Sequence, residues 1–569
     1  MTRKLPVPSW MRTYRRGDLS GDLSAGLTVA VMLIPQGMAY AMLAGLPPVV
    51  GLYAATIPLI VYAFVGSSRQ LAVGPVAIVS LLTLSGISAL AEPGSGQFVA
   101  LAALLALLSG VIQLGLGLLR AGFIVNFISH AVISGFTSAA AIVIGLSQLK
   151  QLLGVSLASG HSVFELVAEA ALRIGEANPY TVTIGVVSIA LLVAAKKIVP
   201  KFPAALVVVV LGTLTTWFFD LPDQGVAIVG AVPGGIPAPS IPLLETRAIP
   251  ALLVTALTIS FVGFMESFAV AKSIATREKY KIDANRELKG LGLANVAAGF
   301  FSGYPVTGGF SRSAVNYQAG ARTGLASIVT ALLILATLFA FTSLFHYLPT
   351  AVLAAIIVVA VYGLVDVHGA VHLFKLKRTD GWALLITFAA TLAIGIETGI
   401  LVGIAFSMLV FIWRSAYPHS ARLGYLARDD IFRNVERFPE AVTFPGTLIL
   451  RIDASLYFAN MAFLEHSLRS VLVDQPECHD IILDFAGVND MDAVAVETLE
   501  ALIGEMESQG VTVRIAAMKG PVRDITARAG WPERFGDRIA YGSIERALED
   551  MGMVAAGQGL SALREEVAR

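Results

Sequence analysis

A long apolar stretch interrupted by prolines and glycines restricts the fold of this chain more than any other feature. Nearly every residue from 33 to 83 is apolar, yet helix-breaking residues recur through it: Pro35, Pro47, Pro48, Pro58, Gly66, Gly74 and Pro75. In hydrocarbon, non-helical backbone survives only where protein or a water-filled cavity covers it. Membrane proteins use such breaks as binding sites, because the free N–H groups that begin a half-helix attract anions. The stretch therefore predicts an interrupted membrane helix at an anion site.

The composition excludes several other classes of protein. Hydrophobic residues make up 56% of the 569-residue chain and charged residues only 14%, whereas charged residues are about a quarter of a soluble globular protein. The formal net charge is zero, which leaves no basic excess for binding nucleic acid. The single cysteine, Cys478, excludes an internal disulfide and a multi-cysteine metal site. The sequence shows no nucleophile paired with a base and no cluster of metal ligands. We therefore expect that the protein is not an enzyme and that it binds no cofactor or metal.

Apolar runs fill the chain up to about Arg414, after which charges become frequent. Alone or as short broken pairs, the runs suit a hydrocarbon core of about 30 Å. We count fourteen, at about residues 23–45, 50–65, 74–89, 97–118, 123–153, 180–196, 202–218, 250–272, 288–302, 310–319, 324–347, 349–366, 380–397 and 398–414. The expected domains are an N-terminal arm (1–20), a transmembrane domain (21–415), a linker (416–439), an α/β domain (440–555) and a C-terminal tail (556–569).

Basic residues in the short joints predict the orientation of the chain. They precede the first span or follow an even-numbered one: Arg3 to Arg16, Lys196 to Lys201, Arg277 to Lys289 and Lys375 to Arg378. Since Lys and Arg favour the cytoplasmic side, both termini and the polar C-terminal part should face the cytoplasm.

Two of the predicted spans indicate an internal repeat. The third opens after SSRQLAVGP and the tenth after SGYPVTGG, and both are short. If the fourteen spans divide into two halves of seven, the third and tenth spans each take the third place of their half. Because seven is odd, the two halves cross the membrane with opposite topology. Paired short, Gly/Pro-interrupted segments are the best sequence indication of a transporter site. Two half-helix starts should therefore meet near the midplane around one anion.

Several side chains in these segments suit an anion. In TGGFSRSAVN, Ser311 and Ser313 offer hydroxyls and Arg312 a fixed cation, and an arginine at membrane depth usually faces a cavity or a partner. The alternative is an interfacial arginine that reaches the headgroups. Pro75 suits the first turn of a helix and would leave the N–H groups of Val76 and Ala77 free, unless the break is only a kink.

Two polar residues of the first span and one glutamate are further candidates. Gln36 and Tyr40 are spaced i, i+4 and share a helix face, so they either donate hydrogen bonds to an oxyanion or hold neighbouring helices together. Glu266 lies about sixteen residues into an apolar run. Such a carboxyl group can take up a proton and couple its entry to that of the anion. The alternatives are a permanent partner of Arg312 or a carboxylate at a helix end.

These residues resemble the SulP anion transporters, also called sulfate permeases. The shared signature is Pro47, Gly51, Leu52, Tyr53, Ala54, Ala55, Tyr62, Gly66, Ser67, Ser68 and Arg69, with Val50 where the family usually has Tyr. The segments PQGMAYA, GSSRQLAVGPVA, FMESFAVAK and FSRSAVNYQAGARTG are similar to the sulfate-transporting branch found in plants and bacteria.

The resemblance implies a fold, a function and a site. The fold would be α-helical, with fourteen spans as two inverted seven-span repeats that form core and gate domains, often in a homodimer. Members move sulfate, bicarbonate, chloride, oxalate or dicarboxylates. The implied site is Gln36, Tyr40, the backbone near Val76 and Ala77, and then Gly309, Phe310, Ser311 and Arg312, with Glu266 for proton coupling. Some sulfate-transporting relatives have Ser in place of Gly309, so this chain lacks one hydroxyl.

The polar C-terminal part alternates strand and helix patterns, which indicates an α/β domain. DFAGVNDMDAVAVETLEAL resembles a STAS domain, in which Asp492 would cap the next helix. Soluble relatives carry a phosphorylatable Ser just after this Asp, but Ala493 stands here. We expect a structural, dimer-supporting or protein-binding domain.

The sequence thus predicts a secondary active transporter that carries an inorganic oxyanion, most simply sulfate with protons, by an elevator-type movement. We place it in a bacterial inner membrane, in contact with lipid. The alternatives are a bicarbonate or C4-dicarboxylate transporter, with sodium in place of protons, and an anion sensor that signals through the STAS domain.

Overall fold

A computed structural model gives the fold and describes residues 9–12, 14–123, 129–155, 163–198, 203–236, 239–240 and 248–554. The chain divides into two compact units, Met1–Ser407 and Met408–Arg569. The predicted tail 556–569, residues 1–8 and 13 of the predicted arm, and Lys201 of the orientation argument lie outside the described residues.

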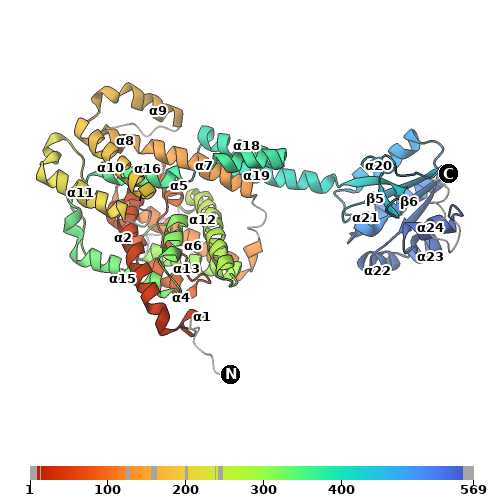
Figure 1. Ribbon diagram of the computed structural model, residues 1–569, viewed down its shortest axis with the longest axis horizontal. Helices are drawn as coiled ribbons and strands as arrows, with labels where there is room; N and C mark the ends of the chain where they lie inside the picture. The colour runs from red at the N-terminus through yellow and green to blue at the C-terminus, as the bar shows by residue number, and fades with distance from the viewer. Residues whose placement is uncertain are drawn as a thin grey trace. The chain divides into compact units, whose positions relative to one another are not determined.

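The first unit is built almost entirely from helices (Figure 1). They are α1 (Ser9–Arg12), α2 (Leu19–Leu43), α3 (Pro48–Ala54), α4 (Ile57–Val65), α5 (Ala77–Ser88), α6 (Gly96–Leu118), α7 (His130–Ser147), α8 (Leu149–Leu153), α9 (Val163–Leu172), α10 (Pro179–Ile198), α11 (Ala204–Phe218), α12 (Ile249–Arg277), α13 (Ala284–Phe300), α14 (Phe310–Gln318), α15 (Leu325–Ala340), α16 (Thr350–Tyr362), α17 (Val367–Leu376) and α18 (Arg378–Ile394). Two short strands, β1 (Val73–Gly74) and β2 (Thr307–Gly308), interrupt them. Helix α19 (Ile396–Ala416) crosses the boundary between the units.

Each of the fourteen predicted apolar runs contains a helix. Within the described residues, seven helical stretches are long and apolar enough to cross a membrane, and four further apolar helices are shorter. The helical membrane fold agrees with the sequence, whereas the count of fourteen spans stays a prediction.

The first apolar stretch is interrupted at residues 44–47, 55–56 and 66–76, but not at its first proline. Helix α2 continues through Pro35, because membrane helices tolerate proline where neighbouring groups satisfy the freed carbonyl. The longest interruption follows α4, where the chain passes through β1 before it resumes as α5. The break that the sequence predicts is therefore real, and it lies just before the third predicted span.

The second unit is an α/β domain. Its strands are β3 (Ser420–Leu426), β4 (Ile431–Asn434), β5 (Thr447–Ile452), β6 (Asp480–Asp484) and β7 (Thr512–Ala516), in the spatial order β4-β3-β5-β6-β7. Strands β5, β6 and β7 are parallel, and β3 is antiparallel to both of its neighbours. Its helices are α20 (Met461–Asp474), α21 (Ala493–Ser508), α22 (Gly520–Arg528), α23 (Trp531–Phe535) and α24 (Ile544–Asp550).

Alternation of side chains along β6 shows why the sheet is covered on both faces. Ile481 and Leu483 belong to one buried cluster with α20 and α21. Ile482, between them, belongs to a second cluster with Leu548 of α24. Successive residues of a strand point to opposite faces, so a continuous apolar run is what a strand buried on both faces requires.

One predicted boundary differs from the structure. Residues 416–439 were predicted as a linker, but they contain β3 and β4, and β3 pairs with β5 in the main sheet. The segment SARLGYLARDDIFRN conceals the strand pattern because Arg422 and Gly424 interrupt the apolar residues of β3, and because β4, the edge strand, is short, charged and partly exposed. The sheet therefore begins close to the end of α19.

Candidate anion-binding site

The two short strands of the first unit pair with each other. They are antiparallel, with Val73 opposite Gly308 and Gly74 opposite Thr307. Helices α5 and α14 begin shortly after these strands. The two interrupted segments that the sequence selected from opposite halves of the chain are thus in direct contact.

The start of each half-helix presents backbone donors. The helices follow Val76 and Gly309, and neither residue makes a side-chain cap. The first N–H groups of a helix lack acceptors within the helix, and the helix dipole puts a partial positive charge there. Val76 and Ala77 are each 6% exposed, and Gly309 is buried and donates to the Ala72 carbonyl at 3.1 Å. Two such helix N-termini side by side can bind an anion.

Arg312 places a buried cation between these two starts. Its side chain is only 1% exposed, and Nη1 donates to the carbonyl of Pro75, just before α5. Among the described residues, Nε and Nη2 have no hydrogen-bond partner. A Cβ added to Gly309 would lie 2.9 Å from Nη2, so glycine makes room for the guanidinium group. Because buried donors are almost always paired, the unused N–H groups on these two nitrogens suit the oxygen atoms of an anion.

Glu266 of α12 provides a negative group near this cation. Its Oε2 atom is buried without a partner among the described residues, and the carboxylate interacts electrostatically with Arg312 and Tyr40. A carboxylate close to an anion site repels the anion when charged and admits it when protonated.

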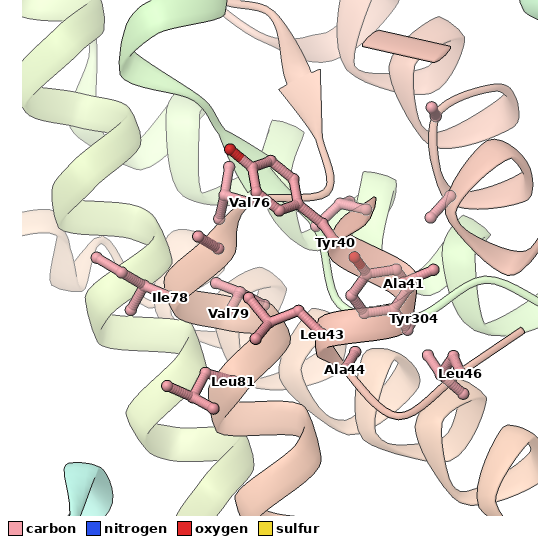
Figure 2. Packing of buried hydrophobic residues seen from close by; sticks show 14 of the residues in the cluster. Tyr40, Ala41, Leu43, Ala44, Leu46, Val76, Ile78, Val79, Leu81 and Tyr304 are labelled. Atoms are coloured by element: carbon pink, nitrogen blue, oxygen red, sulfur yellow. The ribbon is translucent and has the colours of Figure 1, made fainter. Parts of the chain in front are cut away.

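Gln36 and Tyr40 extend the site from α2. Each is 6% exposed, and the Oε1 atom of Gln36 has no partner among the described residues. Figure 2 shows the ring of Tyr40 beside Val76 at the start of α5. Tyr40 also interacts electrostatically with Arg312, so α2 and the two half-helix starts belong to one polar region.

The remaining predicted residues lie on an open side. Phe310 is 61% exposed, and Ser311 is also exposed. The start of α14 is therefore covered at Gly309 and Arg312 but not at the two residues between them, which leaves a side from which a ligand can approach.

Sequence reasoning did not select several side chains that support the site. Tyr304 is fully buried, and its hydroxyl lies 2.8 Å from that of Ser80, which donates to the Val76 carbonyl in the first turn of α5. Asn316 donates to the Gln70 carbonyl at 2.9 Å, and it shares the FSRSAVN motif with Arg312, so the motif was the available signal. Ser313, whose hydroxyl the sequence did single out, accepts from the Ala72 amide at 3.0 Å. For Tyr304 the sequence offered no signal beyond its position next to Pro305.

The assembled site is electropositive and rich in unused donors. One guanidinium group and two helix starts outweigh the single carboxylate of Glu266, and the free donors are N–H groups that match oxygen acceptors. Such an arrangement can replace the hydration shell of an oxyanion.

Comparison with known proteins places this arrangement in a family. The family model described as the sulfate permease family matches residues 19–387, and the STAS domain model matches residues 438–548. The chain belongs to the sulfate permease family. Its members are multi-pass membrane transporters, and this permease carries the STAS domain that its sequence predicted.

Curated relatives are similar over nearly the whole permease. Sulfate transporter 4.1, chloroplastic, of Arabidopsis thaliana is 40% identical over 96% of this chain and 82% of its own length. Probable sulfate transporter MT1781 of Mycobacterium tuberculosis is 32% identical over 95% of this chain and 96% of its own length.

Solved structures share the fold. The structure of SLC26A9 has a TM-score of 0.87 at 25% identity and covers 96% of this chain and 93% of that one. The transmembrane domain of the cyanobacterial bicarbonate transporter BicA has a TM-score of 0.60 at 24% identity, covering 69% of this chain and 98% of that one. The helical membrane fold with a C-terminal STAS domain is therefore shared with this group of anion transporters.

Proposed function

We propose that this permease is a secondary active transporter of an inorganic oxyanion, and that sulfate is the anion. The observation that carries the proposal is that Nε and Nη2 of buried Arg312, beside two helix starts, have no hydrogen-bond partner among the described residues. Divalent sulfate suits a site with this excess of positive charge and donors. The names of the relatives from Arabidopsis thaliana and Mycobacterium tuberculosis, both sulfate transporters, support the same substrate.

Glu266 is the proposed proton-coupling residue. Its unpaired, buried carboxylate oxygen lies in the same polar region as Arg312. Protonation removes a negative charge that opposes the anion, so an inward proton gradient favours the loaded state. The proton and the anion then cross together.

The proposed movement is elevator-like. Strand pairing between β1 and β2, together with the contact from Arg312 to Pro75, joins both half-helices into one body. This body, the core, would carry the site past the remaining helices, the gate, without being dismantled. The site residues of the proposal are Gln36, Tyr40, Val76, Ala77, Gly309, Phe310, Ser311 and Arg312.

The surroundings of the transporter follow from the same proposal. Both termini face the cytoplasm, the STAS domain supports a homodimer or a protein partner, and lipid surrounds the apolar helices. Asp492 caps α21 by accepting from the Ala495 amide and also accepts from the Phe458 amide, so its carboxylate holds two chain segments together.

Uptake of labelled sulfate by proteoliposomes tests the proposal. We expect uptake that an inward proton gradient stimulates, and competition by sulfate over bicarbonate, chloride and dicarboxylates. Arg312→Gln should abolish uptake. Glu266→Gln should retain sulfate binding but lose stimulation by the gradient. Thr387→Val, which removes a buried hydroxyl that donates to the Ala383 carbonyl within its own helix α18, is the control. Binding without flux would instead identify a sensor, and stimulation by sodium alone would contradict proton coupling.

A further inference from the structure

Helix α13 carries two fully buried polar side chains that lie outside the proposed anion contacts. Glu287 and Asn295 are both 0% exposed. Each bonds to a segment that leads into one of the two half-helices. The two side chains therefore connect a single helix to both parts of the site.

Asn295 holds the segment that enters the second half-helix. Its Oδ1 accepts from the Val306 amide at 2.7 Å, and its Nδ2 donates to the Val306 carbonyl at 3.0 Å. The carboxamide thus satisfies both backbone groups of the residue that directly precedes β2, as a neighbouring strand would do. Nδ2 also donates to Oε1 of Gln113 on α6 at 3.0 Å, and Gln113 donates in turn to the Ser260 carbonyl of α12.

Glu287 holds the segment that enters the first half-helix. Its carboxylate accepts from the Tyr62 hydroxyl at 2.6 Å, from the amide and hydroxyl of Ser67 at 2.7 and 2.6 Å, and from the Ser68 amide at 3.0 Å. Hydrogen bonds to a charged acceptor are stronger than neutral ones. Residues 66–68 are therefore tied to α13 a few residues before β1.

Close backbone contacts fix α13 itself. A Cβ on Gly292 would lie 2.6 Å from the Leu114 nitrogen of α6, and a Cβ on Gly110 of α6 would lie 2.6 Å from the Val296 nitrogen. A Cβ on Gly290 would lie 2.9 Å from the Gly66 Cα. Backbone atoms cannot move aside as flexible side chains do, so α13 has no freedom to shift against α6 or the 66–68 loop. Figure 1 shows α6 and α13 side by side.

We propose that α13 sets the relative position of the two half-helix starts, with Glu287 and Asn295 as its positioning residues. Neither residue contacts the anion in this proposal. They act by fixing where the backbone donors of α5 and α14 point. The link to anion affinity rests on the proposed function, whereas the positioning itself is a property of the fold.

Hydrogen–deuterium exchange of the purified full-length protein tests the positioning without any transport assay. Asn295→Asp keeps the size of the side chain but replaces the donor to the Val306 carbonyl with an acceptor, and Glu287→Gln removes the charge. We expect amides 306–313 to exchange about tenfold faster in Asn295→Asp, the effect of losing one buried hydrogen bond. Amides 66–74 and 76–78 should show the same increase in Glu287→Gln. Thr387→Val should change neither segment.

Milder variants keep the test decisive if the first two fail to fold. Tyr62→Phe removes one donor to Glu287, and Gln113→Met removes one acceptor for Asn295. Each should speed amide exchange in the same segment as the corresponding α13 variant does. Unchanged exchange in both segments, or an equal increase throughout the first unit, would overturn the positioning role.

Equilibrium binding of labelled sulfate to the same samples separates this inference from the proposed function. We expect about tenfold weaker binding in each α13 variant, since one misplaced donor costs roughly one hydrogen bond, with wild-type affinity in Thr387→Val. If the wild-type protein binds no sulfate, the proposed substrate is wrong, and the exchange data still decide the positioning. Local exchange increases with unchanged sulfate affinity would overturn the link between α13 and the site.

Discussion

At the scale of single residues, the site depends on how closely Arg312 approaches the start of its own helix. The guanidinium group occupies space that any side chain at position 309 would enter. It bonds to Pro75 through one nitrogen, and its other two nitrogens have no partner in the part of the chain that the structure describes. Its position, rather than its charge alone, makes it available to an anion.

Gly309→Ala tests this packing. The added methyl group would lie 2.9 Å from Nη2 of Arg312, so the guanidinium group must move away from the helix start. We expect sulfate affinity to fall about tenfold, the effect of about one lost hydrogen bond, measured by equilibrium binding. Gly115→Ala in α6, where nothing lies within 4 Å of the added carbon, should bind as the wild type does. Equal affinities for the two variants would show that the packing at Gly309 is unimportant.

The single cysteine allows a second test at this scale, in the STAS domain. Burial raises the pKa of the Cys478 thiol, and the residue is 6% exposed. The reactive thiolate should therefore form only at higher pH than in an ordinary cysteine, whose pKa is about 8.5. We expect slow alkylation by iodoacetamide in the native protein, with a pH–rate midpoint above that value, and rapid alkylation in denaturant.

A matched control makes the alkylation result interpretable. Ser508→Cys in a Cys478→Ser background places a thiol on an exposed position of α21. It should react at the ordinary rate and midpoint. Native Cys478 reacting as fast as this control would mean that the thiol is not protected by the fold.

At the scale of elements, the sequence predicts what repeats and hydropathy can encode. Apolar runs located the helices, and the matching Gly/Pro breaks correctly predicted that residues around Gly74 and Gly308 meet. The sequence could not reveal Glu287 or Asn295 as supports, because their partners lie far along the chain and only the tertiary fold brings them together. It also missed β3, because Arg422 and Gly424 interrupt its apolar residues and the short, charged edge strand β4 follows it.

The contact between α6 and α13 yields a stability prediction. Gly292→Ala would put a carbon 2.6 Å from the backbone of Leu114, so the helices must separate. Overpacking of this kind costs about 1–3 kcal/mol, and we expect a lower midpoint of thermal unfolding in detergent. Gly115→Ala in α6 has free space and should keep or raise the midpoint, since alanine favours helix over glycine. A midpoint for Gly292→Ala at or above that of Gly115→Ala would contradict the tight contact.

At the scale of the whole molecule, the two halves of the membrane unit complete each other. Asp22 in α2 is fully buried and accepts from the amides of Arg322 and Thr323 in the second half. Glu287 and Arg312 make the reverse connection to residues before α5. Neither half contains all the partners that its own buried polar groups need.

The order of synthesis gives a test of this dependence. Val73→Cys places a thiol within β1, and chains cut before Cys478 carry no other cysteine. Stalled chains cut after residue 300 and extended by a linker that fills the ribosomal tunnel lack β2 and should leave this thiol open to a small alkylating reagent, whereas chains cut after residue 345 with the same linker should protect it. Phe339→Cys in place of Val73→Cys, at a position 78% exposed, is the control that stays reactive in the longer chain. Protection of Val73→Cys in the shorter chain would show that the first half folds by itself.

The two-residue sheet thus has a consequence for biogenesis. Until the ribosome has translated Gly308, the pairing partner of Val73 does not exist. The first half of the membrane unit therefore enters the bilayer with the backbone N–H and C=O groups of β1 unpaired. This interval is when a nascent chain most needs help from the insertion machinery, and it ends only when the later strand arrives.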